Sequence, residues 1–334
     1  MTTTPPIRRG LALVATMTLS GLGLVACAAP TDSVDPAELT AATNETSAFP
    51  LTVDDCGATV ELEARPERIL TVGTAAVELL DAAGASQYIA ARTGEFGAGL
   101  PEGLSSPPSD DLIVDPADPT TEQIITSDPD LIYGYGLFNA DVEQIRDAGI
   151  PVLTVQGECG HDATTEVGER GWLSITDDIR RLGAIFGTQS AAEAAAQELE
   201  DRIVAVERPA TGETVAWVYY FSSEDAVSAY GGTGLPATVL ESTGLENVYG
   251  DQSETYLTVS TESLLEAQPD WIVLTYGLYG ETEEQAKEKF LSEPGISALK
   301  AVAEDRIVLV PAGTSSPSPR TIEGLEKIVA ETNG

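Results

Sequence analysis

Short apolar runs alternate with helical segments along most of the chain from residue 49 onward. Two stretches in which apolar and polar residues alternate, 49–53 and 59–63, flank Asp54-Asp55-Cys56-Gly57 and predict a β-hairpin. After the hairpin, strands are predicted at 68–72, 88–92, 130–134 and 150–155, and helices at 76–83, 121–127 and 141–148. Strand–helix alternation of this kind is typical of a mainly parallel α/β sheet.

A helical region interrupts this alternation at 172–206. Its second part is mostly Ala, Glu, Gln and Leu, which form helices well, yet it contains few bulky apolar residues, as expected of a helix that bridges two bodies. The alternation then resumes with strands at 214–221, 271–276 and 306–310, and helices at 235–243, 282–290 and 319–332. We therefore predict an α/β protein of two Rossmann-like lobes with mainly parallel sheets. The predicted N-terminal lobe is 49–187, the long interlobe helix 188–208 and the C-terminal lobe 209–334.

One short pattern occurs in both halves of the chain, at 121–132 and again at 261–272. In each copy Thr-Glu opens a short helix, two apolar residues follow, and Pro-Asp leads into a hydrophobic strand. The copies lie 140 residues apart, which is too far for a solenoid repeat of roughly 20–50 residues. The pattern thus predicts two lobes of similar build, with Glu122 and Glu262 at equivalent places.

The N-terminus has the features of an export signal. Arg8-Arg9 precede an apolar run at 10–24, which is too short to span a bilayer stably as a mature helix. Leu24-Val-Ala-Cys27 resembles a bacterial lipobox, so residues 1–27 are predicted to be a lipoprotein signal peptide that ends in a lipidated Cys27. An ordinary signal peptide cut nearby is the alternative. Residues 28–48 are predicted to be a disordered acidic tether, which would anchor the protein to the extracytoplasmic face of the cell membrane.

The charge of the chain excludes one large class of function. There are 54 acidic residues against 17 basic ones, a formal net charge of -37. Nucleic-acid binding needs a basic surface, so no nucleic-acid partner is expected. The excess of acidic residues is typical of a protein that stays soluble in a salty or external milieu.

Cysteine and histidine usage limits the chemistry further. Apart from Cys27, the chain has Cys56 and Cys159, and an even pair outside the cytoplasm usually forms a disulfide. His161 is the only histidine, so a metal site built on a histidine cluster is not expected. No nucleophile elbow, P-loop or dinucleotide-binding glycine motif is present, which disfavours a secreted α/β hydrolytic enzyme. We predict neither a catalytic residue nor a cofactor.

Several segments, in this order and spacing, resemble the substrate-binding proteins of bacterial ABC importers for ferric siderophores, haem and vitamin B12. They are the lipobox, Arg68-Ile-Leu-Thr-Val, Val77-Glu78-Leu-Leu, the two Thr-Glu…Pro-Asp copies, Ala148-Gly-Ile-Pro-Val, Arg181-Leu-Gly-Ala-Ile-Phe-Gly and Ser318-Pro319-Arg320. The resemblance covers roughly residues 49–334. It implies two lobes joined by a rigid helix, a ligand in the cleft between them, and no catalysis.

The resemblance also implies a partner. In this family one Glu on each lobe docks onto arginine pockets of the ABC permease, a homo- or heterodimer, and the matching positions here are Glu122 and Glu262. The alternative is that each Glu only stabilises a helix N-terminus. A monomeric receptor is expected.

Ligands of open α/β sheets bind at the carboxyl ends of the strands. The candidate ligand-binding residues are Thr74, Arg92, Tyr135, Phe221, Tyr230, Tyr256, Tyr276 and Arg320. Tyr230 is predicted in a Gly-rich loop, and each tyrosine has the alternative of a half-buried strand residue. Tyr133, Trp217 and Trp271 lie inside strands and are predicted to be core residues.

Taken together, these features predict a lipid-anchored receptor that binds an iron(III)–siderophore complex and delivers it to an ABC permease. A corrinoid (vitamin B12) or haem receptor of the same family is the alternative, and His161 is the candidate haem ligand. Only Arg92 and Arg320 supply positive charge near the predicted cleft. A neutral or cationic hydroxamate chelate is therefore favoured over an anionic triscatecholate.

Overall fold

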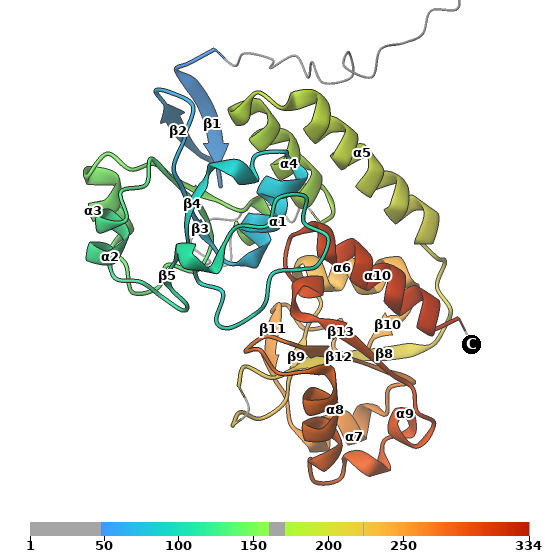
Figure 1. Ribbon diagram of the computed structural model, residues 1–334. Helices are drawn as coiled ribbons and strands as arrows, with labels where there is room; N and C mark the ends of the chain where they lie inside the picture. Colours follow the sequence, from blue (N-terminus) through green and yellow to red (C-terminus); the bar gives the residue numbers. More distant parts are fainter. Residues whose placement is uncertain (1–47, 160–170, 223, 334) are drawn as a thin grey trace, which may run out of the picture. The chain divides into compact units, whose positions relative to one another are not determined.

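The computed structural model describes residues 48–159, 171–222 and 224–333 (Figure 1). The chain divides into two compact units, 1–43 and 44–334. All described residues belong to the second unit. The predicted signal peptide, Cys27, nearly all of the tether and His161 lie outside the described residues.

The first sheet contains five parallel strands in the order β5-β4-β3-β6-β7. Its strands are β3 (Ile69–Val72), β4 (Ile89–Thr93), β5 (Ile113–Asp115), β6 (Leu131–Gly134) and β7 (Val152–Thr154). Helices α1 (Thr74–Ala82), α2 (Thr121–Thr126) and α3 (Val142–Asp147) alternate with them. A hairpin of β1 (Leu51–Asp55) and β2 (Ala58–Leu62) precedes the sheet, as predicted.

The second sheet has the order β11-β9-β8-β12-β13, and β10 also pairs with β8. Its strands are β8 (Thr214–Tyr219), β9 (Ser228–Tyr230), β10 (Glu246–Asn247), β11 (Tyr256–Thr258), β12 (Trp271–Tyr276) and β13 (Ile307–Pro311). The helices of this half are α6 (Gly234–Thr243), α7 (Thr261–Ala267), α8 (Glu283–Ser292), α9 (Lys300–Ala303) and α10 (Pro319–Glu331). Among the described strands of this sheet, β9 pairs antiparallel with both β8 and β11, and the other three pairs are parallel. The sheet is therefore mainly parallel, as predicted.

Helices α4 (Leu173–Phe186) and α5 (Gln189–Val206) connect the two halves of the chain. Gly187 adopts the left-handed conformation that ends α4. The buried stripe of α5 is Ala192, Ala196, Leu199 and Ile203, so its first half packs closely through small side chains. A Cβ at Gly183 would lie 2.3 Å from the Cβ of Ala192, which shows how closely α4 and α5 approach. A long helix between the two lobes is confirmed, and α5 spans Gln189–Val206 where 188–208 was predicted.

Each sheet buries its two faces in different apolar cores. One face of the first sheet packs on α2 and α3 through Ile124 and Ile145, and one face of the second packs on α7 and α8 through Leu264 and Phe290. The other faces share a single core with α1, α4, α5, α6 and α10. The two lobes are therefore joined by continuous apolar packing as well as by α5.

The repeated sequence pattern folds in the same way in both halves. Thr120 and Ser260 are the N-caps of α2 and α7, and each forms a capping box with the residue three positions later. The caps lie one residue before the predicted Thr121 and Thr261. After the helices, Asp128 and Gln268 both have positive φ, and β6 and β12 then pair with β3 and β8. The prediction of two lobes of similar build is confirmed.

Three short strands were not predicted. β5, β9 and β11 have three residues each, and no strand was predicted at their positions. They exist because longer neighbours provide pairing partners: β4 for β5, and β8 for β9, which in turn pairs with β11. Tyr230 accordingly lies in β9 and faces Tyr256 of β11 across the pair, instead of lying in a Gly-rich loop.

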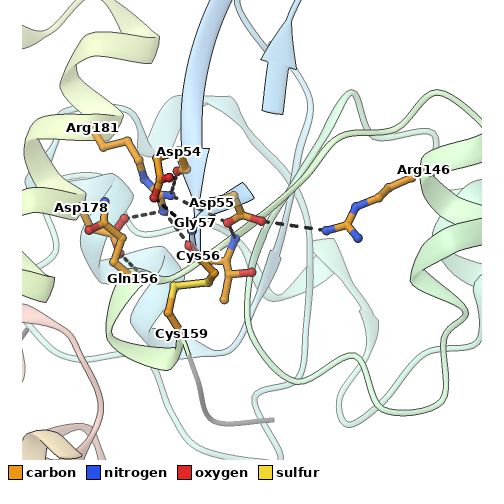
Figure 2. Close-up of a disulfide and its surroundings, with 10 residues drawn as sticks. Asp54, Asp55, Cys56, Gly57, Arg146, Gln156, Cys159, Asp178 and Arg181 are labelled. Atoms are coloured by element: carbon orange, nitrogen blue, oxygen red, sulfur yellow. Dashed lines mark hydrogen bonds and ion pairs between the residues drawn. A yellow bond between two sulfur atoms is a disulfide. The ribbon is translucent and has the colours of Figure 1, made fainter. Parts of the chain in front are cut away.

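A disulfide between Cys56 and Cys159 fastens the hairpin to the segment after β7 (Figure 2). Figure 2 shows buried charged groups beside it: Asp178 accepts from the backbone N–H of Gln156 at 2.6 Å and pairs with Arg181 at 2.5 Å. Asp55 accepts from the backbone N–H of Thr154 at 2.6 Å. The predicted disulfide is confirmed. Together with these hydrogen bonds, it fixes the position of the segment after β7, which includes Glu158.

Candidate functional site

A cavity of about 400 Å³ lies beyond the carboxyl ends of strands from both sheets. Its walls come from the segments after β3, β4, β6, β12 and β13 and from the first turn of α10. The lining residues are 72–75, 94–99, 135, 155, 158, 276–278, 280, 281, 311–313, 316 and 320. The cavity is thus at the place where parallel α/β sheets bind ligands, and both lobes contribute to it.

Close backbone contacts bring the strand ends together at this cavity. Gly134 ends β6 with a φ of 146°, and a Cβ there would lie 2.1 Å from the carbonyl oxygen of Val72 at the end of β3. The next residue, Tyr135, donates its backbone N–H to the same oxygen at 3.3 Å. Because residue 134 has no side chain, the two strands end side by side, and Tyr135 becomes part of the cavity wall.

Four of the eight predicted ligand-binding residues line the cavity. Thr74 begins α1 after β3, Tyr135 follows β6, Tyr276 ends β12, and Arg320 is in the first turn of α10. All four side chains are half-buried. The structure therefore brings together, from elements far apart in the sequence, two phenols, one hydroxyl and one guanidinium.

Arg92 is not among the lining residues. Its side chain is 1% exposed and makes two bonds to the carboxylate of Glu95, at 2.8 and 2.7 Å. It also donates to the backbone carbonyls of Pro108 and Ser109 and pairs with Asp110 at 3.2 Å. The guanidinium is fully used in holding the loop after β4, and Glu95, which lines the cavity, is one of its partners.

The other three predicted residues form an aromatic group with Tyr219 of β8: Tyr230 is in β9, Tyr256 is in β11, and Phe221 follows β8. Tyr230 stacks on Tyr219 with ring centroids 4.6 Å apart, and Phe221 and Tyr256 lie edge-on to Tyr219 at 5.1 and 6.4 Å. Tyr230 is 4% exposed and donates its hydroxyl to Ser315 at 2.8 Å, and burial raises its pKa, so the phenol stays protonated. Phe221 and Tyr256 are 46% and 41% exposed. None of the three lines the cavity.

Carboxylates at the cavity were not predicted. Glu95, Glu158 and Glu281 all line it. Glu281 accepts the backbone N–H groups of Gly277, Leu278 and Tyr279 at 2.9, 3.2 and 2.9 Å, and so fixes the turn after β12. In a chain with 54 acidic residues, a single glutamate in a loop gives no sequence signal.

Arg320 meets a buried carboxylate of the other lobe. Its Nη2 lies 3.6 Å from Oε1 of Glu78, which is in α1 and is 4% exposed. Burial raises the pKa of Glu78, and the charge of Arg320 opposes that rise. A Cβ at Gly313 would lie 2.5 Å from Cδ of Arg320, so the glycine provides the space for this side chain.

The two lobes also touch beside the cavity. Phe96 and Tyr279 contact each other edge to face, with ring centroids 6.4 Å apart. A Cβ at Gly280 would lie 3.0 Å from the carbonyl oxygen of Gly97. The turns after β4 and β12 therefore approach to backbone contact.

Glu122 and Glu262 are not among the residues that line this cavity. Each is exposed in the first turn of its helix, α2 or α7. Both glutamates have the same sequence surroundings. A Ser or Thr N-cap precedes each, a buried apolar residue follows two positions later, and a Pro-Asp turn comes after the helix. The two carboxylates thus occupy equivalent places in the two lobes, as predicted.

No group of three or more His, Cys, Asp or Glu side chains within residues 48–159, 171–222 and 224–333 is placed to hold a metal ion. In the same residues, no helix has the length and apolar character needed to cross a membrane.

Two lobes, one connecting helix and a cavity at the strand ends of both define a solute-binding protein. The chain belongs to the periplasmic binding protein family, whose model matches residues 70–314. This confirms the family and the fold class that the sequence motifs predict. The family is one of extracytoplasmic binding proteins, so the protein is not an enzyme, and the small molecule it binds is cargo instead of a cofactor.

Solved structures show the same fold. A protein of an ABC-type Fe3+-hydroxamate transport system from Saccharomonospora viridis is 26% identical with a TM-score of 0.74, covering 86% of this chain and 100% of its own. The catecholate-siderophore binding protein VctP from Vibrio cholerae is 19% identical (TM-score 0.62; 84% and 98% covered). The vitamin B12 binding protein BtuF of Vibrio cholerae is 21% identical (0.60; 80% and 96%). No curated protein matches the chain.

Proposed function

We propose that this protein is a lipid-anchored receptor that binds an iron(III)–siderophore complex in the cavity between its lobes and delivers it to an ABC permease. The observation that carries the proposal is the cavity itself, with Tyr135 and Tyr276 on its walls and Arg320 in the first turn of α10. Aromatic rings supply apolar contact with a polar tip, and a guanidinium supplies planar donors for the oxygen atoms of a chelate.

A hydroxamate chelate suits this lining better than a catecholate. Of the two arginines near the strand ends, Arg92 is neutralised by Glu95 and Asp110, and Arg320 faces Glu78. Glu158 and Glu281 add negative charge to the lining. A ferric triscatecholate carries three negative charges and would be repelled, whereas a neutral or cationic trihydroxamate would not. The likeness to the Fe3+-hydroxamate system protein supports the same choice.

Corrinoid and haem remain the alternative cargoes of the same receptor. The solved vitamin B12 and haem binding proteins share the fold at 18–21% identity, which speaks for the fold alone. No described feature of the cavity favours either ligand over a siderophore.

The receptor would work at the outer face of the cell membrane. The Arg8-Arg9 and apolar segment would direct export, and lipidation of Cys27 would hold residues 28–48 as a tether between membrane and lobes. One acyl-type anchor at the N-terminus leaves the lobes free to meet a permease in the same membrane.

Glu122 and Glu262 are proposed as the docking groups for that permease. A permease made of two halves needs acidic groups at two matched positions, and charge-assisted arginine–carboxylate bonds favour a defined geometry. Equivalent capped helices present both carboxylates to solvent. Neither glutamate lines the cavity, so docking and ligand binding use different residues.

The docking role is tested with the double variant Glu122→Arg/Glu262→Arg. Purified protein should bind a ferric trihydroxamate with unchanged affinity, while uptake of that iron chelate by cells carrying only this variant should be lost. Glu102→Arg, at another exposed glutamate, is the matched control and should support normal uptake. Normal uptake by the double variant would refute docking through these residues.

A further inference from the structure

Two buried polar atoms from different lobes face each other at the cavity without a hydrogen bond. Oε1 of Glu78 and Nη2 of Arg320 are both inaccessible to solvent and have no hydrogen-bond partner, and 3.6 Å separates them. Glu78 is 4% exposed in α1, and the side chain of Arg320 is 13% exposed at the start of α10. A buried donor that lacks a hydrogen-bond partner is costly, so the opposite charge of Glu78 is what offsets the burial of Nη2.

The carboxylate changes what Arg320 offers to a ligand. Beside Glu78, the guanidinium keeps its N–H donors but its positive charge is cancelled by a fixed negative charge of the other lobe. The other charged residues on the lining are the glutamates 95, 158 and 281. An anionic ligand therefore meets no net positive charge on the described walls of the cavity, although it would find a donor there.

We propose that Glu78 is a specificity-determining residue, which cancels the charge of Arg320 so that the cavity accepts neutral or cationic chelates and rejects anionic ones. Arg320 then acts as a hydrogen-bond donor to a neutral oxygen acceptor, such as a hydroxamate carbonyl. This inference rests on the proposed function, because it concerns which iron chelate enters the same cavity. Glu78 acts through Arg320 and need not touch the ligand.

A purely structural role makes a different prediction. If Glu78 only holds α1 against α10, its replacement should weaken the binding of every ligand by a similar factor. A specificity role changes the ratio of two affinities instead, and it does so in opposite directions for opposite ligand charges. The ratio is therefore the informative quantity.

The test compares two probes, a neutral ferric trihydroxamate and a ferric triscatecholate of charge 3−, on wild-type protein and on Glu78→Gln. Glutamine keeps the size of the side chain and removes its charge. We expect the Kd ratio of catecholate to hydroxamate to fall about tenfold or more in the variant, because the uncovered guanidinium attracts the anion. The change should shrink at high salt.

Three further variants make the result specific. In Glu78→Gln/Arg320→Gln neither charge is present, and the ratio should return toward the wild-type value. In Arg320→Gln the uncompensated Glu78 should raise the ratio above the wild-type value. Glu323→Gln, an exposed carboxylate on α10, should leave the ratio unchanged because solvent screens its charge.

The results for wild-type protein and for the variants test different claims. Wild-type protein that binds neither probe contradicts the proposed function. Wild-type protein that binds the trihydroxamate, together with an unaltered ratio in folded Glu78→Gln, overturns the role of Glu78 and leaves the proposed function standing. If Glu78→Gln does not fold, Arg320→Gln decides: a raised ratio supports the proposal, and an unaltered ratio overturns it.

Discussion

The position of Arg320 depends on the absence of a side chain at residue 313. The backbone of Gly313 does not need the left-handed region, so an alanine can adopt its conformation. Its methyl group, however, would lie 2.5 Å from Cδ and 3.0 Å from Nε of Arg320. Since both atoms belong to a long flexible side chain, the arginine would move and the backbone would stay.

Gly313→Ala should therefore weaken ligand binding without unfolding the protein. We expect the affinity for a ferric trihydroxamate to fall about tenfold, with a change in thermal stability within the range of ordinary surface substitutions. Gly99→Ala is the matched control, because a Cβ at this other cavity residue meets no atom within 4 Å. Titration calorimetry on both variants makes the comparison, and equal affinities would contradict the role given to Gly313.

Asp178 makes the stability of the protein depend on pH. Burial raises its pKa from 3.8 to about 6, against the attraction of Arg181 and the N–H of Gln156. The folded state therefore keeps a proton on this carboxyl in the range where the unfolded chain has lost it. The contribution of Asp178 to stability is present below about pH 4 and is lost as the pH rises through about 6.

We expect the free energy of unfolding to decrease between pH 4 and 6.5. Asp178 should contribute up to about 3 kcal/mol of this decrease. Asp178→Asn cannot titrate there, so its free energy of unfolding should depend less on pH over this interval, even though the variant loses the partner of Arg181. Burial also raises the pKa of Asp55 and Glu78, so part of the slope should remain. Denaturant unfolding at a series of pH values gives the pH dependence of the free energy of unfolding for the wild type and for the variant. Equal pH dependence in the two proteins would contradict a raised pKa of Asp178.

The sequence predicts where a residue lies along a strand, but it does not predict the direction in which the side chain points. Tyr135 and Tyr276 could be assigned to the cavity because each comes at the end of a strand, and strand ends meet there. Arg92 occupies a similar place in β4, yet its side chain turns to Glu95 and the carbonyls of a loop with no sequence signal. The role of Glu78 was equally hidden, because its partner is 242 positions further along the chain.

Helices and strands were predicted more completely than side-chain contacts. The repeated pattern specifies α2 and α7 locally, through an N-cap, one buried apolar residue and a Pro-Asp turn. Short strands such as β9 and β11 depend on pairing with distant segments, and no local pattern of three residues can indicate that. The misplacement of Tyr230 in a loop followed directly from this.

The disulfide connects elements that are 103 residues apart in the sequence. Closing a loop of that length restricts the unfolded chain and stabilises the folded state by about 4–5 kcal/mol in the chain-entropy model. We expect Cys56→Ser/Cys159→Ser to lower the midpoint of thermal unfolding, and a reductant to lower the wild-type midpoint to a similar value. A reductant should not affect the variant. Alkylation of both thiols in unreduced wild-type protein, seen by mass spectrometry, would show that the bridge is absent.

In the proposed receptor, cargo and permease would bind to separate surfaces. A shared apolar core and the rigid α5 connect the lobes, the cavity lies at the strand ends of both, and Glu122 and Glu262 lie on short helices outside it. Because of this separation, replacing Glu122 and Glu262 with arginine should abolish uptake and leave the affinity for the iron chelate unchanged. Sequence motifs were sufficient to predict two lobes of similar build, because the motifs recur at matched places in both halves.

The central claim is that the cavity binds a ferric hydroxamate, and intrinsic tryptophan fluorescence tests it most directly. Trp217 donates its indole N–H to Thr275 at 2.9 Å, next to Tyr276 on the cavity wall, so a bound iron chelate should quench its emission. Purified protein is titrated with ferric hydroxamates, ferric catecholates, cobalamin and haemin. The account predicts saturable quenching at the lowest concentration with a ferric hydroxamate. Saturable quenching by cobalamin or haemin alone, or by none of the four, would contradict it.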